Sequence, residues 1–168
     1  LISATAIVEA MVDSTGPTVI DAGNGALSVT ATGRNVAIAT PSTAGGGVIS
    51  ITALTPTATI QAGTRATFSG GTTTSGDFTV AVTVLENTAR ATASLLNFAI
   101  GGGAGAIADA EVTSAADAKA VVASSANITS SGAVSVTAAG TATTTASLDA
   151  TAGGAITAGI YQAGTQID

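Results

Sequence analysis

Apolar and polar side chains alternate with a period of two along most of the chain, and one alternating phrase occurs twice. In residues 18–31 and again in residues 126–138, an Ile leads into a Gly-containing turn, after which Leu or Val alternates with Ser and Thr. Successive side chains of a β-strand point to opposite faces, so this pattern indicates strands with one apolar and one polar face. Each phrase therefore predicts the end of one strand, a tight turn and the start of the next strand.

Other alternating segments also repeat along the chain. Residues 25–33 match residues 132–140 at an offset of 107 positions, and residues 6–14 match residues 106–114 at an offset of 100. Degenerate repeats separated by Gly, Asn-Gly, Ser-Gly and Pro are typical of a solenoid, in which each coil stacks on its neighbours. At about 20 residues per coil, the sequence predicts a rod of roughly eight rungs stacked about 4.8 Å apart.

An Ala-rich helix is the competing interpretation for residues 115–126, because Ala is the best helix former. The alternation nevertheless continues there, with small apolar side chains at even positions and Asp117 and Lys119 on the other face. The aligned region near the start of the chain contains Gly16-Pro17, which would interrupt a helix. A strand is therefore the preferred interpretation, and the helix stays open as an alternative.

The composition favours an ordered chain whose core is made of small side chains. Of the 168 residues, 46% are hydrophobic, but only 2% are aromatic and 8% are charged. Disordered chains are poor in hydrophobic residues and rich in charge, so this composition predicts order. Stacked Ala, Val and Ile side chains can fill the narrow interior of a coil at the density of a protein core.

Charge and hydrophobicity also bear on the partners of the chain. The net charge is −6, and the four cations are Arg34, Arg65, Arg90 and Lys119. They form no basic stripe that could neutralise phosphates, so we expect no nucleic acid partner. The longest uncharged apolar stretch, residues 95–108, is shorter than the roughly 20 residues of a membrane-spanning helix, so no membrane-spanning segment is expected. The chain has no Cys, so disulfides do not hold the fold.

Few residues are candidates for chemistry. The chain has no His and no Cys, and no Ser lies in a Gly-x-Ser-x-Gly motif, so the sequence predicts no enzyme. The glycine-rich residues 101–106 fit the dinucleotide fingerprint, but among strand repeats they are better interpreted as a corner of a coil. Asp109, Glu111 and Asp117 are candidate ligands for a structural Ca²⁺ ion, although solvated carboxylates on an outward face are the preferred interpretation. No other metal ion and no cofactor is predicted.

Residues 101–112, the Thr/Ser/Ala strand that follows and residues 126–138 resemble the β-strand repeats of very large bacterial exoproteins. These exoproteins are related to filamentous haemagglutinin and to the passenger adhesins of autotransporters. The resemblance implies a right-handed parallel β-helix that is exported to the cell surface.

We therefore expect an all-β protein, a right-handed parallel β-helix (β-solenoid) over residues 1–168, with repeats at about 1–60, 61–105 and 106–168 in a longer chain. The expected function is mechanical, as a structural shaft or filament-forming segment of an extracellular bacterial adhesin. Expected partners are adjacent repeats, identical chains that associate laterally or end to end, and a host or matrix surface ligand. Two alternatives stay open: a carbohydrate- or surface-binding module and a polysaccharide-active β-helix enzyme.

Overall fold

A computed structural model describes residues 1–13 and 18–168, and these residues form strands and turns without a helix. Ser14 and Gly16-Pro17, which belong to the repeats considered above, lie outside the described residues. In chain order the strands are β1 (Ile2–Ala4), β2 (Val8–Asp13), β3 (Val19–Asp21), β4 (Leu27–Ala39), β5 (Ser42–Leu54), β6 (Thr57–Ile60), β7 (Thr64–Ser69), β8 (Thr72–Ser75), β9 (Phe78–Val112), β10 (Ala118–Val122), β11 (Asn127–Ser130), β12 (Val134–Gly153) and β13 (Ile156–Ile167).

All strand pairings among the described residues are parallel, and paired residues are 51 to 56 positions apart in the sequence. The prediction of an all-β chain with parallel strands is confirmed. The predicted coil of about 20 residues is wrong, because each coil takes more than 50 residues. The described residues make three coils, which we define as coil 1 (residues 2–13 and 18–57), coil 2 (58–109) and coil 3 (110–164).

The coils are long because a strand continues through places where the sequence suggests a corner. β9 covers 35 residues, and its buried and exposed positions alternate on both sides of a bulge at Leu85. The glycines of residues 101–105 lie inside this strand, paired with β5 and β13. Gly was therefore a poor marker of coil boundaries, and the number of rungs was overestimated.

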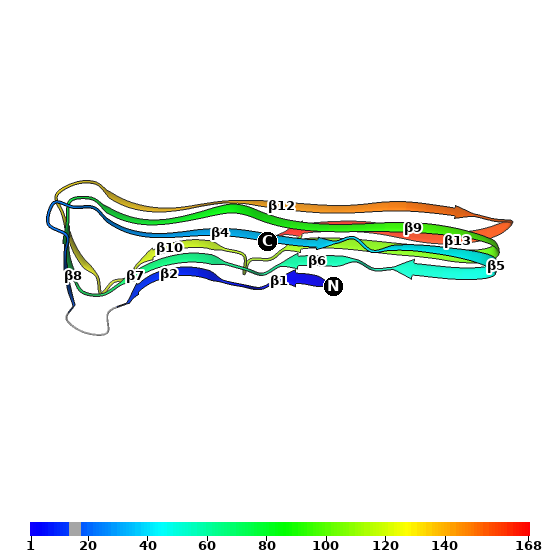
Figure 1. Cartoon of the computed structure of the whole chain (residues 1–168), viewed down its shortest axis with the longest axis horizontal. Helices are drawn as coiled ribbons and strands as arrows, with labels where there is room; N and C mark the ends of the chain where they lie inside the picture. The colour runs from blue at the N-terminus through cyan, green and yellow to red at the C-terminus, as the bar shows by residue number, and fades with distance from the viewer. Residues whose placement is uncertain (14–17) are drawn as a thin grey trace.

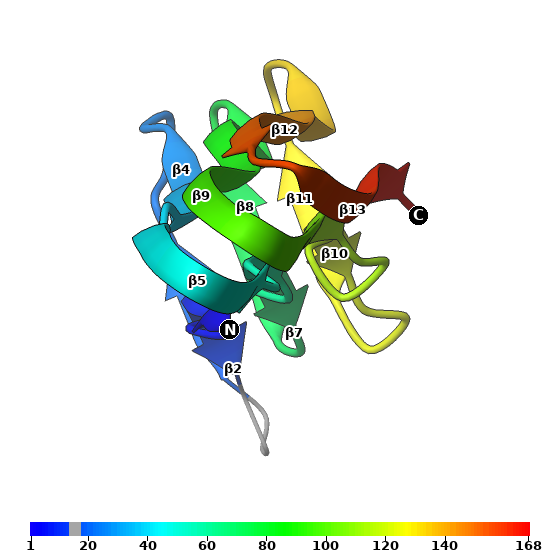
Figure 2. The same ribbon diagram turned by 90° about the vertical axis from the view of Figure 1, so that its right-hand side faces the viewer.

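Each coil is an elongated loop with a broad end and a narrow end (Figure 1). An outgoing arm runs from the broad end as β4, the first part of β9 and β12, and a return arm leads back through β6 and β7. The short strands β3, β8 and β11 cross the broad end, where Gly70 and Gly71 turn the chain with φ values of 90° and 82°. Seen from the narrow end, coil 2, mainly in green, lies between coil 1 in blue to cyan and coil 3 in yellow to red (Figure 2). We call residues 42–54, 94–106 and 150–162 the narrow end.

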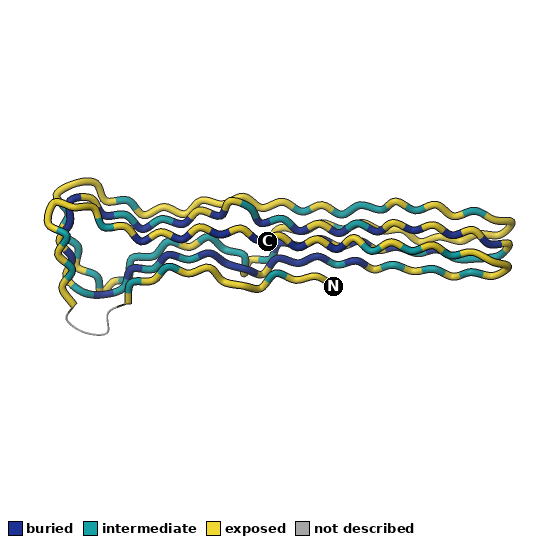
Figure 3. Tube along the Cα trace, viewed as in Figure 1, coloured by how far each residue is buried: buried dark blue, intermediate teal, exposed yellow. Residues whose placement is uncertain are grey.

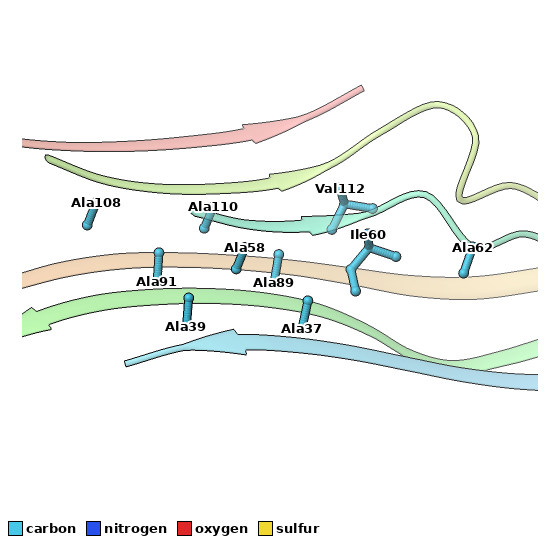
Figure 4. Close-up of a cluster of buried hydrophobic side chains, with 10 residues drawn as sticks. All are labelled: Ala37, Ala39, Ala58, Ile60, Ala62, Ala89, Ala91, Ala108, Ala110 and Val112. Carbon is cyan, nitrogen blue, oxygen red and sulfur yellow. The ribbon is translucent and has the colours of Figure 1, made fainter. Parts of the chain in front are cut away.

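Buried and exposed positions alternate along these arms (Figure 3). The buried hydrophobic residues form two clusters. The cluster at the broad end consists of Val29, Ala31, Ala66, Phe68, Phe78, Val80, Val82 and Val84. In it the rings of Phe68 and Phe78 meet edge to face, with centroids 5.1 Å apart. The cluster midway along the arms consists of Ala37, Ala39, Ala58, Ile60, Ala62, Ala89, Ala91, Ala108, Ala110 and Val112 (Figure 4). The core is therefore built mainly from Ala and Val, with two aromatic rings at one end.

Two buried asparagines lie on β4 and β9 between the two clusters. Asn35 donates from Nδ2 to Oδ1 of Asn87 at 2.7 Å and to the carbonyl of Ala62 at 3.2 Å. Asn87 in turn donates from Nδ2 to the carbonyl of Ala116 at 3.1 Å. The corresponding residue of coil 3 is Ala142, so the amide ladder ends there. Because an unpaired buried amide costs about 1–3 kcal/mol, this ladder favours the observed register between coils 1 and 2.

The register tests the two repeat offsets. The offset of 107 is confirmed, because Leu27 and Val134 lie on opposite sides of the same residue, Phe78. The offset of 100 is wrong, because Val112 falls in the column of Ala4 and not eight residues further along. We use the word column for residues that stack in register from coil to coil.

The Ala-rich residues 115–126 do not form a helix. They contain β10, in which Ala118 pairs with Thr64 and Val122 pairs with Phe68, flanked by turns. The preferred strand interpretation is confirmed, because cross-coil pairing outweighs the local helix propensity of Ala.

Candidate interaction surfaces

The three candidate metal ligands do not gather at one place. Asp109 and Glu111 lie two residues apart on β9, whereas Asp117 precedes β10 and its Oδ1 lies 3.3 Å from Nη2 of Arg65. Among residues 1–13 and 18–168, no group of three or more His, Cys, Asp or Glu side chains could hold a metal ion. Among the described residues these three acids therefore form no common site, and Asp117 is paired with Arg65.

Both ion pairs found among the described residues join neighbouring coils. Arg34 of coil 1 lies 2.7 Å from Glu86 of coil 2, and Arg65 of coil 2 pairs with Asp117 of coil 3. A hydrogen bond from Thr88, and then the hydrogen bond from Arg34, hold the pKa of Glu86 below its ordinary value. These pairs are partly exposed, so they contribute little stability and mainly favour one register of the coils.

The glycine-rich residues 101–106 lie within β9, on the return arm of the narrow end. Dinucleotide binding needs these glycines between a strand and a helix, whose N-terminus would face the pyrophosphate. No helix follows them, because the strand continues to Val112. The chain reverses just before them, between Phe98 and Gly101, where the pairing of β9 passes from β12 to β13.

A ridge of large apolar side chains runs along the outgoing arm of the narrow end. Leu96, Phe98 and Ile100 of coil 2 alternate with buried residues and are exposed. The neighbours of Leu96 and Phe98 in coils 1 and 3 are small or polar: Ala44 and Thr151 lie beside Leu96, and Gly46 and Gly153 lie beside Phe98. The central coil therefore stands out from its neighbours on this face.

On the return arm of the narrow end, the central coil is instead recessed between its two neighbours. Here coil 2 supplies Gly101, Gly103 and Gly105, while larger side chains of coils 1 and 3 flank these glycines. The result is an apolar groove of about 350 Å³ with Gly103 and Gly105 between Ile51 and Ile160. Large exposed apolar patches mark interaction sites, so both faces of the narrow end are candidate interaction surfaces.

The narrow end is also free of charge. Residues 42–54, 94–106 and 150–162 contain no Asp, Glu, Lys or Arg. Alternation in the sequence did not predict this surface, because the apolar positions of an alternating strand are expected to face the core. The available signal was the run of residues 95–100, in which apolar side chains occupy both sets of alternating positions.

Coil 3 presents a further apolar surface at the end of the stack. By alternation Val134 and Val136 face the interior of the coil, yet their exposed fractions are 60% and 48%. Phe78 and Val80, the residues beside them in coil 2, are fully buried. The difference arises because no further coil of the described chain covers coil 3 on its outer side.

No family model, curated protein or solved structure matches the chain. The described residues include no helix that is long and apolar enough to cross a membrane. The class of protein is therefore defined by the fold itself, as an all-β chain of stacked parallel coils with two uncharged apolar surfaces.

Proposed function

We propose that this chain is a non-enzymatic structural shaft segment of an extracellular bacterial surface protein, built as a right-handed β-helix. The observation that carries the proposal is the continuity of the columns, since β2, β7 and β10, and likewise β4, β9 and β12, keep one parallel register through three coils. Backbone hydrogen bonds therefore run along the stacking axis through every coil. Such a stack holds its two ends at a fixed separation, which is the mechanical task of a shaft.

The proposed handedness follows from the connections between strands. Crossover connections between parallel strands of one sheet are right-handed in about 98% of cases. β7 and β10, for example, are neighbours in one parallel sheet, and the chain makes a full coil between them. A right-handed coil is therefore the expected winding.

The cell-surface location is supported by the resemblance of residues 101–112 and 126–138 to repeats of exported bacterial proteins. Antibodies raised against the chain are expected to label intact, unpermeabilised cells of the bacterium that produces it. Labelling only after permeabilisation would contradict an extracellular role.

Duplication of coil 2 tests the shaft directly. Ala58 and Ala110 occupy one column, so a second copy of residues 58–109 inserted after Asp109 keeps every column in register. We expect a folded protein that is extended along the stacking axis by one strand spacing, about 4.8 Å, as measured by small-angle scattering. The circular-dichroism signal of strands should increase in proportion. The control is an insert of the same composition with its residues in scrambled order. If the duplicated coil unfolds the chain as completely as the scrambled insert does, the proposal is overturned.

A surface-binding module is the second candidate, favoured by the uncharged apolar narrow end. Its test is binding of the chain to hydrophobic beads or to isolated cell-wall polysaccharide, with Phe98→Ser as the matched variant. Binding that Phe98→Ser abolishes would support this candidate.

A further inference from the structure

The three glycines on the floor of the apolar groove have no structural role within the coil. Gly101, Gly103 and Gly105 occupy outward positions of β9, and none of them has a positive φ value. A Cβ atom would meet nothing within 4 Å at Gly101, and its nearest neighbour would lie 3.8 Å away at Gly103 and 3.6 Å away at Gly105. Glycine weakens the interior of a strand and often marks close approach of another chain. The coil itself does not require these glycines, so the groove is not a by-product of its packing.

The groove is bounded on both sides by coils of the described chain. Its walls lie beside the glycines of coil 2 and are formed mainly by four isoleucines with exposed fractions between 74% and 84%, Ile49 and Ile51 of coil 1 and Ile156 and Ile160 of coil 3. The groove is therefore independent of what precedes coil 1 or follows coil 3. The two walls are two strand spacings apart, about 10 Å, so the groove has room for a single row of side chains.

The ridge on the outgoing arm of the same coil is a row of this kind. Leu96, Phe98 and Ile100 follow one another at intervals of two residues, as the three glycines do, so ridge and groove are each about 13 Å long. Nδ2 of Asn97 donates to the carbonyl of Gly103 at 3.0 Å, so the two surfaces lie back to back on coil 2. Neither surface carries a charged residue. Contact between them would therefore remove no charged group from water.

We infer that the ridge of one copy of this chain docks in the groove of a second copy, with Leu96 of one beside Gly103 of the other. This lateral contact goes beyond the proposed function as a shaft and does not depend on it. The contact joins two different surfaces on opposite faces of the narrow end, so it does not close on itself. Repetition of the contact gives a row of chains that lie side by side.

The shape of the coils determines the direction of the second copy. The broad end is wider than the narrow end (Figure 1), so two copies that point in the same direction would collide at their broad ends. The copies therefore lie with their broad ends on opposite sides of the contact. One face of the narrow end is about 20 Å long and about 14 Å wide, which is less than the roughly 800 Å² per partner of a standard interface. A single contact is therefore weak and forms at high concentration.

Cross-linking of single-cysteine variants detects such a weak contact, because the chain has no Cys of its own. Leu96→Cys and Gly103→Cys are mixed at high concentration with a short bis-maleimide, which spans the spacing of about 10 Å between packed sheets. We expect dimers to form about tenfold faster in this mixture than in either variant alone, because docking raises the effective concentration of the two thiols. Ala139→Cys, at an exposed position of coil 3 outside the narrow end, replaces Leu96→Cys in the control mixture. Equal rates in all samples would overturn the inference.

Filling the groove is a second test that keeps the fold. Gly105→Leu, added to Gly103→Cys, has room for its Cβ, so the melting temperature should not fall, whereas cross-linking to Leu96→Cys should drop to the rate of the control mixture. Ala139→Leu in the same background adds an equal apolar side chain elsewhere and should leave the rate unchanged. Undiminished cross-linking with the filled groove would refute docking in the groove. Stronger binding of Gly105→Leu to hydrophobic beads, without preferential cross-linking, would assign the narrow end to surface binding and also refute it. If coil duplication extends the chain while all cross-linking rates are equal, the shaft stands and only this inference falls.

Discussion

The broad end and the narrow end are formed by the same three coils, but their interiors are filled in opposite ways. At the broad end three sheets surround a space wide enough for the rings of Phe68 and Phe78. At the narrow end the two arms of each coil face each other directly, and the side chains between them include Ala99, Ala104 and Ala106. The width of the coil therefore decides how large an inward side chain can be.

This difference in width determines where large apolar side chains point. In β9 the inward Phe78 is fully buried, whereas Phe98, twenty residues later on the same strand, points outward and is 53% exposed. The inward residue beside it is Asn97, which donates from Nδ2 to the carbonyl of Gly103 at 3.0 Å. At the narrow end large apolar side chains thus also lie on the outer face, which leaves an apolar surface free for contacts.

The two phenylalanines offer the largest test of this comparison. Phe78→Ala is expected to lower the free energy of unfolding by about 3–5 kcal/mol, because it removes a fully buried ring and leaves a cavity. Phe98→Ala is expected to change it by about 0.5 kcal/mol or less, as a surface substitution does. Urea denaturation of both variants measures the difference. Equal losses would mean that the narrow end has a core of its own around Phe98.

The strand content of this fold could be predicted from the sequence, and the length of its coils could not. Alternation is a local property, so residues 25–33 and 132–140 were correctly matched as equivalent strands. Coil length depends on which distant strands pair. The sequence of the middle coil, coil 2, differs too much from its neighbours for this pairing to be recognised. Its residues beside Leu27 and Val29 are Phe78 and Val80, and beside Ile20 it has Thr73. The middle repeat could therefore not be aligned in the correct register from the sequence.

The candidate surfaces were harder to predict than the strands. Asp109, Glu111 and Asp117 were singled out as nearby acids in the sequence, but their proximity was local and the fold separates them. Glu9 and Lys119 are 110 positions apart and share a column only because the coils stack. No local pattern distinguishes such a pair before the register is known.

Thr73 at the broad end provides the next largest effect. It is fully buried between Ile20 and Ile128, and its hydroxyl has no hydrogen-bond partner. Thr73→Val keeps the shape and removes the unpaired hydroxyl, so we expect a gain of about 1 kcal/mol and a rise in melting temperature of about 2–4 °C. Thr92→Val is the matched control, because the Thr92 hydroxyl bonds to Ser147 at 3.0 Å and its loss should destabilise. A lower melting temperature for Thr73→Val would show that the hydroxyl is satisfied.

The smallest expected effect is the pH dependence of stability. It arises in the arms, which carry charged side chains, and not in the uncharged narrow end. The pKa of Glu86 is lower in the folded chain than its ordinary value of 4.5, because Thr88 and then Arg34 stabilise the carboxylate. A lowered folded pKa contributes stability above pH 4.5, and this contribution is lost as the pH falls through the folded pKa. We therefore expect Glu86→Gln to melt slightly below the wild type at pH 7, and the difference to shrink as the pH falls through the folded pKa of Glu86. Added salt should shrink the difference at pH 7, because the pair is exposed. A difference that does not change with pH would assign the effect to packing of the side chain instead of its charge.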